Sequence, residues 1–225
     1  MKLRYFSPFE WALWIGSVAV IALSFLLGGQ FHILTLIASL LGVTALIFIA
    51  KGNVIGQFFV IVFSLLYALV SLEQRYYGEM ITYLGMSLPA SIVACVSWLK
   101  NPSKQGKNEV QVATMSATKW FWLVISSLLV TLAFYFILRF FNTNNLLVST
   151  ISVTTSFLAA MLLILRSPFY AVAYAANDIV LIVLWVFSCF VSIAYLPMVI
   201  CFVAFLFNDL YGFYSWKKMQ KRQNK

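Results

Sequence analysis

Charge is scarce in this sequence: aspartate, glutamate, lysine and arginine together make up only 9% of its 225 residues. Soluble domains contain about a quarter charged residues, because their surfaces face water. Hydrophobic residues instead make up 63% of the chain and gather in eight runs of about twenty residues, the length of an α-helix that crosses a bilayer. Composition therefore excludes a soluble globular domain and predicts an all-α integral membrane protein.

Residues that build catalytic centres are equally scarce. The single histidine, His32, has no second histidine with which to form a metal site, and Cys95, Cys189 and Cys201 each lie within an apolar run. We find no glycine-rich phosphate loop and no nucleophile elbow. We therefore expect no metal, no cofactor and no enzymatic activity, and we interpret the cysteines as small packing residues.

The apolar runs predict eight transmembrane helices joined by short loops. We expect these helices at residues 8–27, 31–50, 54–72, 79–99, 120–137, 145–165, 169–190 and 194–216. Ser7 and Pro8 suit the start of the first helix, as a capping hydroxyl followed by a residue that needs no N–H partner there. No small-x-small cleavage site precedes Gln30, so we expect the first run to remain as a helix. Gly52 and Gly56 form a G-x-x-x-G pattern, which hints at close helix packing.

Basic residues gather on one side of the predicted membrane. With eight spans, thirteen of the fifteen lysines and arginines fall on the side of both termini, and only Arg75 and Arg139 fall on the other. Because positive charge marks the cytoplasmic side, we expect both termini in the cytoplasm. Seven spans, with the first helix lying at the outer interface, would leave Lys2 and Arg4 outside, so we prefer eight.

Two parts of the chain resemble each other. Each part contains three spans, has a basic residue (Lys51 or Arg166) at the end of its first span, and ends in Ser-Trp followed by lysine, at Trp98 and Trp216. The first part and the helix after it make four spans, so both parts enter the membrane from the same side. This order predicts two parallel repeats joined by a linking helix, as in small sugar transporters of the SWEET type.

The predicted organisation has six segments. They are an N-terminal transmembrane helix at 1–30, a first three-helix repeat at 31–100, a cytoplasmic linker at 101–118, a connecting helix at 119–140, a second three-helix repeat at 145–216, and a basic cytoplasmic tail at 217–225. The expected fold is thus a 3+1+3 arrangement with an extra N-terminal helix. Such folds place their substrate near the midplane, where the two repeats meet.

Polar side chains deep within the seventh span need an explanation. Asp178 falls near the middle of that span, where a carboxylate costs at least about 2.5 kcal/mol on insertion. It either bonds a neighbouring helix or contacts a ligand or a proton. One face of the span combines rings with an amide, at Tyr170, Tyr174, Asn177, Leu181 and Trp185. This face suits a flat aromatic ligand, although aromatic stripes are also common in protein cores. A cationic ring would be attracted by both the aromatic faces and Asp178.

Neighbouring spans add further candidates. In the eighth span Asn208, Tyr211 and Ser215 share a face, and we expect water to reach Asp209 because it lies nearer the cytoplasmic end. Residues 149–156 form a dense hydroxyl cluster, about half of which can bond carbonyls of their own helix. The first repeat offers Gln57, Ser64, Tyr67, Tyr83, Ser87 and Ser91.

Several of these motifs together resemble one known family. The run Asn208-Asp209-Leu210-Tyr211-Gly212-Phe213-Tyr214-Ser215-Trp216 is similar to the carboxy-terminal signature of the nicotinamide riboside transporter family, PnuC. Tyr77-Gly78-Glu79-Met80, Pro89 and Trp98 resemble its first-repeat pattern, and Asn177 with Trp185 resembles its seventh-span pattern. The likeness runs from about Phe31 to Lys218, which is most of the chain.

The resemblance implies a facilitator for a vitamin- or nucleoside-type substrate in a bacterial inner membrane. It also implies a homotrimer and a cytoplasmic kinase that traps the transported molecule, and it places Asn177 and Asn208 in contact with substrate. The chain departs from the family where a tryptophan pair is usual and Tyr170 and Ala173 stand instead. It departs again in the first repeat, with Tyr83 and Ser87 in place of asparagine and tyrosine. The resemblance makes nicotinamide riboside the default substrate. The departures leave thiamine, riboflavin and deoxynucleosides as alternatives.

Three hypotheses follow for the function. The first is facilitated diffusion of a small aromatic molecule, and the second is proton-coupled transport that uses Asp178. The third is a membrane-embedded enzyme or a subunit that transports nothing by itself, and the missing catalytic motifs disfavour the enzyme. The candidate substrate-binding residues are Asn177, Asp178, Tyr174, Tyr170, Trp185, Asn208, Tyr211, Ser87, Ser91 and Tyr83.

Overall fold

The computed structural model describes residues 5–27, 33–73, 77–104, 108–143 and 145–225. Across these ranges the regular structure is helical, apart from one isolated bridge between Pro102 and Val110. Eight helices within the described ranges are long and apolar enough to cross a membrane. The prediction of an all-α membrane protein with eight spans is confirmed. His32, Arg75, Lys2 and Arg4 lie outside the described residues.

The helices follow the predicted runs closely, with two differences described below. In chain order they are α1 (Pro8–Leu27), α2 (Ile33–Ala50), α3 (Ile55–Glu73), α4 (Tyr77–Thr82), the π-helical turn η1 (Tyr83–Ser87), α5 (Leu88–Lys100), α6 (Ala117–Phe140), α7 (Leu146–Ile164), α8 (Tyr170–Val191), the short 3-10 turn η2 (Ile193–Tyr195) and α9 (Leu196–Gln223).

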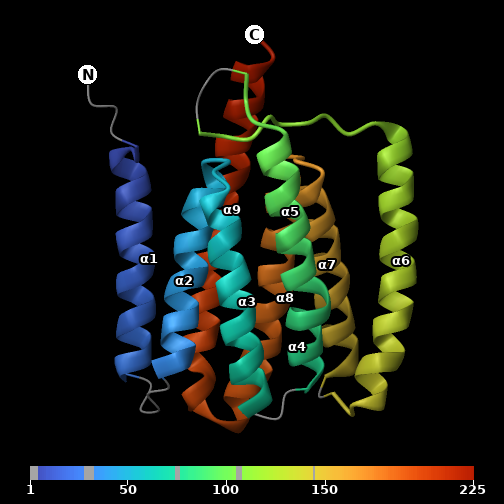
Figure 1. Ribbon diagram of the computed structural model, residues 1–225. Coiled ribbons are helices and arrows are strands. Elements are labelled where there is room, and N and C mark those ends of the chain that lie inside the picture. The colour runs from blue at the N-terminus through green and yellow to red at the C-terminus, as the bar shows by residue number, and fades with distance from the viewer. Residues whose placement is uncertain (1–4, 28–32, 74–76, 105–107, 144) are drawn as a thin grey trace.

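The helices form one bundle, with α1 and α6 at its opposite edges (Figure 1). α1 packs on α2 and α9, whereas α6 packs mainly on α7, so both edge helices keep broad apolar faces free of protein. α1 begins and α9 ends at the same end of the bundle. We call this the basic end, because Lys51, Lys100, Lys119 and Lys217 lie there, and we call the other the distal end.

α1 begins where its sequence predicts, with a reciprocal pair of bonds between Ser7 and Glu10. The Ser7 backbone N–H donates to Glu10 Oε2 (2.6 Å), and the Glu10 N–H donates to Ser7 Oγ (3.2 Å). This capping box satisfies two donors that a helix start leaves open. Glu10 also pairs with Lys51 (3.1 Å) and accepts from the Tyr211 hydroxyl (2.7 Å), so its buried carboxylate fastens α1 to the rest of the bundle.

The predicted fourth span is interrupted. In place of one helix over 79–99, the chain forms α4, the π-helical turn η1 and then α5. Pro89 lies at the start of α5, and proline has no N–H with which to continue the hydrogen bonds of a regular helix. Single π turns inside helices are common at functional sites. Here the turn aims Tyr83 and Ser87 at the cavity described below.

The two Ser-Trp pairs close the basic end through matching hydrogen bonds. Each pair donates its hydroxyl and its indole N–H to the last carbonyls of a helix from the other part of the chain. The bonds run from Ser97 Oγ to Ile164 O (2.9 Å), Trp98 Nε1 to Leu163 O (3.2 Å), Ser215 Oγ to Ala50 O (2.6 Å) and Trp216 Nε1 to Ile49 O (2.8 Å). The two indole rings lie 5.4 Å apart and are fully enclosed, which seals this end of the bundle.

The last helix is longer than predicted, running to Gln223 rather than ending at Trp216. The segment before α6 holds this extension, because Glu109 forms an ion pair with Arg222 and the Val112 N–H donates to Gln223 Oε1 (2.7 Å). The same segment also bonds the turns after α2 and α7. Its amides at Val110 and Ala113 donate to the carbonyls of Gly52 and Arg166 (both 2.9 Å), two residues with left-handed backbone.

Replacing Gly56 with alanine should destabilise the protein by about 1–3 kcal/mol, the usual cost of overpacking a tight contact. A β-carbon at this position would lie 2.8 Å from the Ile49 backbone nitrogen and 2.9 Å from the Ala45 carbonyl oxygen, neither of which can move aside easily. Gly16 in α1 is the matched control, because nothing lies within 4 Å of its β-carbon position. There alanine should be neutral or stabilising by up to about 1 kcal/mol. Denaturant titration in detergent measures both, and equal stabilities would contradict this packing.

Candidate functional site

A cavity of about 380 Å³ lies inside the bundle, between α2, α3, η1 and α5 on one side and α7, α8 and α9 on the other. Pockets for small organic ligands begin at about 300 Å³. The cavity extends from Asp209, near the midpoint of α9, to the turn between α6 and α7 at the distal end. Towards the basic end it stops at the sealed tryptophans, Trp98 and Trp216.

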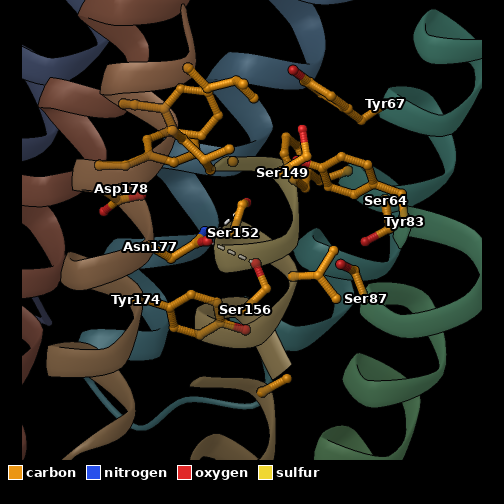
Figure 2. A pocket seen from close by; sticks show the side chains of 18 of the residues that line it. Ser64, Tyr67, Tyr83, Ser87, Ser149, Ser152, Ser156, Tyr174, Asn177 and Asp178 are labelled. Carbon is orange, nitrogen blue, oxygen red and sulfur yellow. Dashed lines mark hydrogen bonds between the residues drawn. The ribbon is translucent and has the colours of Figure 1, made fainter. Parts of the chain in front are cut away.

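Polar and aromatic side chains from both halves of the chain line this cavity (Figure 2). The polar lining consists of Ser64, Tyr67, Tyr83, Ser87, Ser91, Asn142, Thr143, Asn145, Ser149, Ser152, Ser156, Tyr174, Asn177, Asp178, Ser188 and Asp209. The apolar lining includes Gly42, Leu46, Ile49, Phe63, Leu181, Trp185, Phe202 and Phe205. A mixed lining of this kind suits a flat molecule with a few polar groups at its edge.

Asn177 on α8 is held in one orientation by three hydroxyl groups of α7. Ser152 Oγ (3.2 Å), Thr155 Oγ1 (2.8 Å) and Ser156 Oγ (3.0 Å) all donate to Asn177 Oδ1. The bonds from Ser152 and Ser156 are visible in Figure 2. Asn177 Nδ2 has no partner among the described residues, and it is therefore left to donate into the cavity. The fixed amide would recognise a hydrogen-bond acceptor on a ligand.

Aromatic rings form two facing walls of the cavity. Tyr67 and Tyr83 lie with their ring centroids 4.5 Å apart, and Phe63 packs on Tyr83 at 5.8 Å. Tyr174 stands on the other side of the cavity, on α8, and Trp185 follows on the same helix (Figure 2). The distance between such walls decides which rings fit, because aromatic groups stack face to face or edge to face.

Asp178 and Asp209 lie next to each other, with their carboxyl groups in hydrogen-bonding contact. Both are almost fully buried, at 3% and 4% exposure, and both line the cavity. The expectation that water reaches Asp209 from the nearby cytoplasmic end of its helix is wrong, because Asp209 is buried and its side chain faces α8 and the cavity within the bundle.

The structure brings seven of the ten candidate residues to the cavity: Tyr83, Ser87, Ser91, Tyr174, Asn177, Asp178 and Trp185. It places Tyr170, Asn208 and Tyr211 elsewhere. Tyr170 packs on Trp216 in the sealed basic end (4.8 Å between ring centroids). Asn208 Nδ2 donates to Ser17 Oγ of α1 (2.9 Å), and Tyr211 donates to Glu10.

The geometry of α9 explains this division. Successive helical residues point about 100° apart, so the adjacent Asn208 and Asp209 can face different neighbours. Asp209 faces α8 and the cavity, whereas Asn208, Tyr211 and Ser215 face α1 and α2. The predicted shared face of those three residues is therefore present, but it contacts other helices.

Two features of the site cannot be read from the sequence. One is the group of hydroxyls that fixes Asn177: the cluster over 149–156 is visible in the sequence, but its partner on α8 is not. The structure divides that cluster, because Thr150 and Thr154 bond carbonyls of their own helix and Thr154 also contacts Thr131 of α6 (2.7 Å). The second feature is that Phe202 and Phe205 line the cavity. No sequence pattern distinguishes these two residues from phenylalanines that only pack in the core.

Metal binding receives no support from the described part of the chain, where no three histidine, cysteine, aspartate or glutamate side chains lie together as a metal site would require. Cys95, Cys189 and Cys201 are all free thiols.

Comparison with known proteins agrees with this architecture. A family model for the nicotinamide mononucleotide transporter matches residues 32–218. A nicotinamide riboside transporter PnuC of Neisseria mucosa is 26% identical over 192 residues, covering 84% of this chain and 73% of the relative. Another, from Haemophilus influenzae, is 26% identical over 192 residues, covering 85% and 82%.

A solved structure is also similar. The crystal structure of the vitamin B3 transporter PnuC matches with a TM-score of 0.81, covering 98% of this chain and 95% of that one at 24% identity, and thus shares its fold. The family model spans most of the sequence and includes both halves of the cavity. The chain therefore belongs to the nicotinamide mononucleotide transporter family of multi-pass membrane proteins.

Proposed function

We propose that this protein carries a small aromatic nucleoside- or vitamin-type molecule by facilitated diffusion, with nicotinamide riboside as the default substrate. The observation that carries the proposal is the fixed amide of Asn177 inside a cavity of suitable size. The names of the two relatives and of the solved structure point to the same substrate class. Transport needs no catalytic centre, and we propose no enzymatic role.

The chemistry of nicotinamide riboside suits the cavity. Its carboxamide oxygen can accept from Asn177 Nδ2, and its flat ring can stack between the aromatic walls that include Tyr83 and Tyr174. The ring carries a positive charge, which aromatic faces and a nearby carboxyl group both attract. Asp178 and Asp209 supply that carboxyl group. Thiamine, which also contains a cationic ring, is the next candidate, followed by neutral deoxynucleosides.

We further propose a 3+1+3 arrangement of two parallel helix triplets. One triplet is α2, α3 and α4–α5, the other is α7, α8 and α9, with α6 as the connector and α1 as an additional helix. The reciprocal bonds of Ser97 with Trp98 and of Ser215 with Trp216 support this proposal, because each pair caps the first helix of the other triplet. The left-handed turns at Gly52 and Arg166, which follow those two helices, support it as well.

α3 supports a path for polar solute through the first triplet. Gln57, Ser64 and Ser71 recur every seven residues on one buried face of this helix. Their side-chain polar atoms have no partner within the described ranges. Buried polar atoms without protein partners are normally satisfied by water. We propose that this face borders the hydrated route between the cavity and the two membrane surfaces.

The proposed setting is a bacterial inner membrane with both termini in the cytoplasm. In this orientation the cavity extends towards the outer surface, and the sealed tryptophans close the cytoplasmic side. A cytoplasmic kinase would then trap the transported molecule. The free apolar face of α6, which includes Trp122 and Phe136, suits contact with lipid or with other copies in the proposed homotrimer.

Exchanging both Asp178 and Asp209 for asparagine should weaken binding of a cationic substrate selectively. We expect at least about a tenfold loss of affinity, since a buried charge pair contributes about 2 kcal/mol or more. Both residues must be changed, because either carboxyl group can carry the negative charge. Calorimetry measures the loss of affinity for nicotinamide riboside and for its reduced, uncharged form, and the two losses are compared. Equal losses for both ligands would show that charge plays no part.

Flux measurements on purified protein in liposomes test the proposed function. Facilitated diffusion predicts saturable entry of labelled nicotinamide riboside until inside and outside concentrations are equal. Proton-coupled transport through Asp178, the alternative mechanism, predicts accumulation beyond that level that an uncoupler abolishes. A subunit that needs partners would show no flux above that of empty liposomes, and this result would overturn the proposal.

A further inference from the structure

The two aspartates of this chain occur in the same context, as Asn177-Asp178 in α8 and Asn208-Asp209 in α9. These helices pack against each other, and they bring the two carboxyl groups into hydrogen-bonding contact at the wall of the cavity. Both side chains are more than nine-tenths buried. The second half of the chain thus places two acidic groups side by side in the interior of the bundle.

No cation compensates this pair within the described structure. Among the acidic residues whose burial the structure describes, the other two each have a cation, because Glu10 pairs with Lys51 and Glu109 pairs with Arg222. The helices packed on α8 and α9 within the membrane, α1, α2 and α7, contain no lysine or arginine. The nearest basic residue after Asp209 in α9 is Lys217, about 12 Å further along the helix.

The remaining titratable groups near the pair are uncharged in their ordinary state. Tyr170 and Tyr174 of α8 and Cys201 of α9 act on it electrostatically. α2 and α7 contain no titratable side chain, and the one acidic group of α1, Glu10, is occupied by Lys51 and Tyr211. Tyr195 is the one titratable residue of η2. None of these side chains supplies a positive charge.

A proton is the simplest charge that holds two such groups together. A hydrogen bond between carboxyl groups requires a hydrogen on one of them, and two adjacent carboxylates repel each other strongly in a buried site. No amide or hydroxyl of the described residues donates to Asp178 Oδ2. This oxygen is buried at the wall of the cavity without a donor from the described residues, so the group is poised to interact with what enters there.

We propose that Asp178 and Asp209 form a proton-binding site that exchanges its proton for a cationic ligand. When the ligand enters, the O–H bond of the carboxylic acid breaks and the proton leaves through the cavity to bulk water. The carboxylate that remains compensates the positive charge of the ligand, so the total charge of the buried site is unchanged. This inference rests on the proposed function, because the ligand occupies the same cavity.

The exchange makes binding depend on pH in a defined direction. Because binding of the cation releases a proton, its affinity should rise with pH, by about tenfold per pH unit where one full proton is released. The rise should end at the pH where the empty pair has already lost the proton. A neutral ligand of the same shape should bind with a pH-independent affinity.

Calorimetry in buffers of different ionisation enthalpy counts the protons released on binding. With the purified full-length protein we expect release of about one proton for nicotinamide riboside and none for its uncharged reduced form. In Asp209→Asn the new amide can donate to the Asp178 carboxylate, so the cation should still bind but proton release should disappear. Glu109→Gln removes a carboxyl group outside the cavity and should leave the release unchanged. Release that persists in Asp209→Asn, or its absence from the wild type, would overturn the proposal.

An infrared measurement without ligand separates this inference from the proposed function. A carboxylic acid absorbs at a different carbonyl frequency from a carboxylate, so a buried acid should be visible in the wild-type protein at neutral pH and missing in Asp209→Asn. If the carboxylic acid band is present but none of the candidate ligands binds in calorimetry, the proton site is supported and the proposed substrate is rejected. A spectrum identical to that of Asp209→Asn would reject the proton site, whatever ligand binds.

Discussion

Replacing Asn177 with alanine should lower the affinity for nicotinamide riboside by about 10–100-fold, because an unpaired buried acceptor on the ligand costs about 1–3 kcal/mol. Ser152 and Ser156 lose Asn177 Oδ1 as an acceptor in the free and the bound protein alike, whereas Thr155 keeps carbonyls of its own helix as acceptors. The loss of these hydrogen bonds lowers the stability of the protein. It does not change the ligand affinity, because it affects the free and the bound protein equally. Calorimetric titration of wild type and variant gives the ratio directly.

Asn208→Ala is the matched control, with the same side-chain change one helix away. The family resemblance places both asparagines against the substrate, whereas the structure turns Asn208 towards Ser17 of α1. We expect its replacement to lower stability by about 1 kcal/mol, the contribution of a hydrogen bond, and to change ligand affinity less than about twofold. A loss of affinity as large as that of Asn177→Ala would move the site to the α1 side of α9.

Replacing Trp216 with alanine should be among the most destabilising single changes in the protein, at about 3–5 kcal/mol. The side chain has no exposed surface, packs against the rings of Trp98 and Tyr170, and donates to the Ile49 carbonyl (2.8 Å). Its removal opens a cavity where the two halves of the chain meet. Denaturant titration in detergent should show the midpoint shift.

Trp122→Ala in α6 is the corresponding control. This indole is 62% exposed from the protein and faces away from the bundle, so its replacement should change stability by no more than about 0.5 kcal/mol. Similar stabilities for Trp216→Ala and Trp122→Ala would contradict the sealed basic end.

The fold follows from the sequence to a large extent, because a membrane leaves the backbone few choices. Eight apolar runs suffice to predict eight helices, and Ser7 with Pro8 predicts the start of α1. The π-helical turn before Pro89 is less predictable, since a proline within a span produces a kink, a break or a turn depending on its neighbours. The continuation of α9 to Gln223 depends on tertiary partners, Glu109 among them, that no local pattern reveals.

The site follows from the sequence only in part. Helical periodicity places Tyr174, Asn177 and Trp185 on one face, and the structure puts that face at the cavity. Periodicity does not say which neighbour a face meets. For this reason Asn208 and Tyr211 share a face as predicted but contact α1, and the sequence predicts that Asp209 is near water although it lies beside Asp178. Contacts between helices decide these cases.

The most direct test of a ligand site between the two helix triplets is a structure of the protein with bound nicotinamide riboside. We predict that the ligand lies in the cavity, with its carboxamide oxygen within hydrogen-bonding distance of Asn177 Nδ2 and its ring beside Tyr174 or Tyr83. A ligand bound outside this cavity, for example against Asn208 between α1 and α9, would show that the two triplets do not form the ligand site.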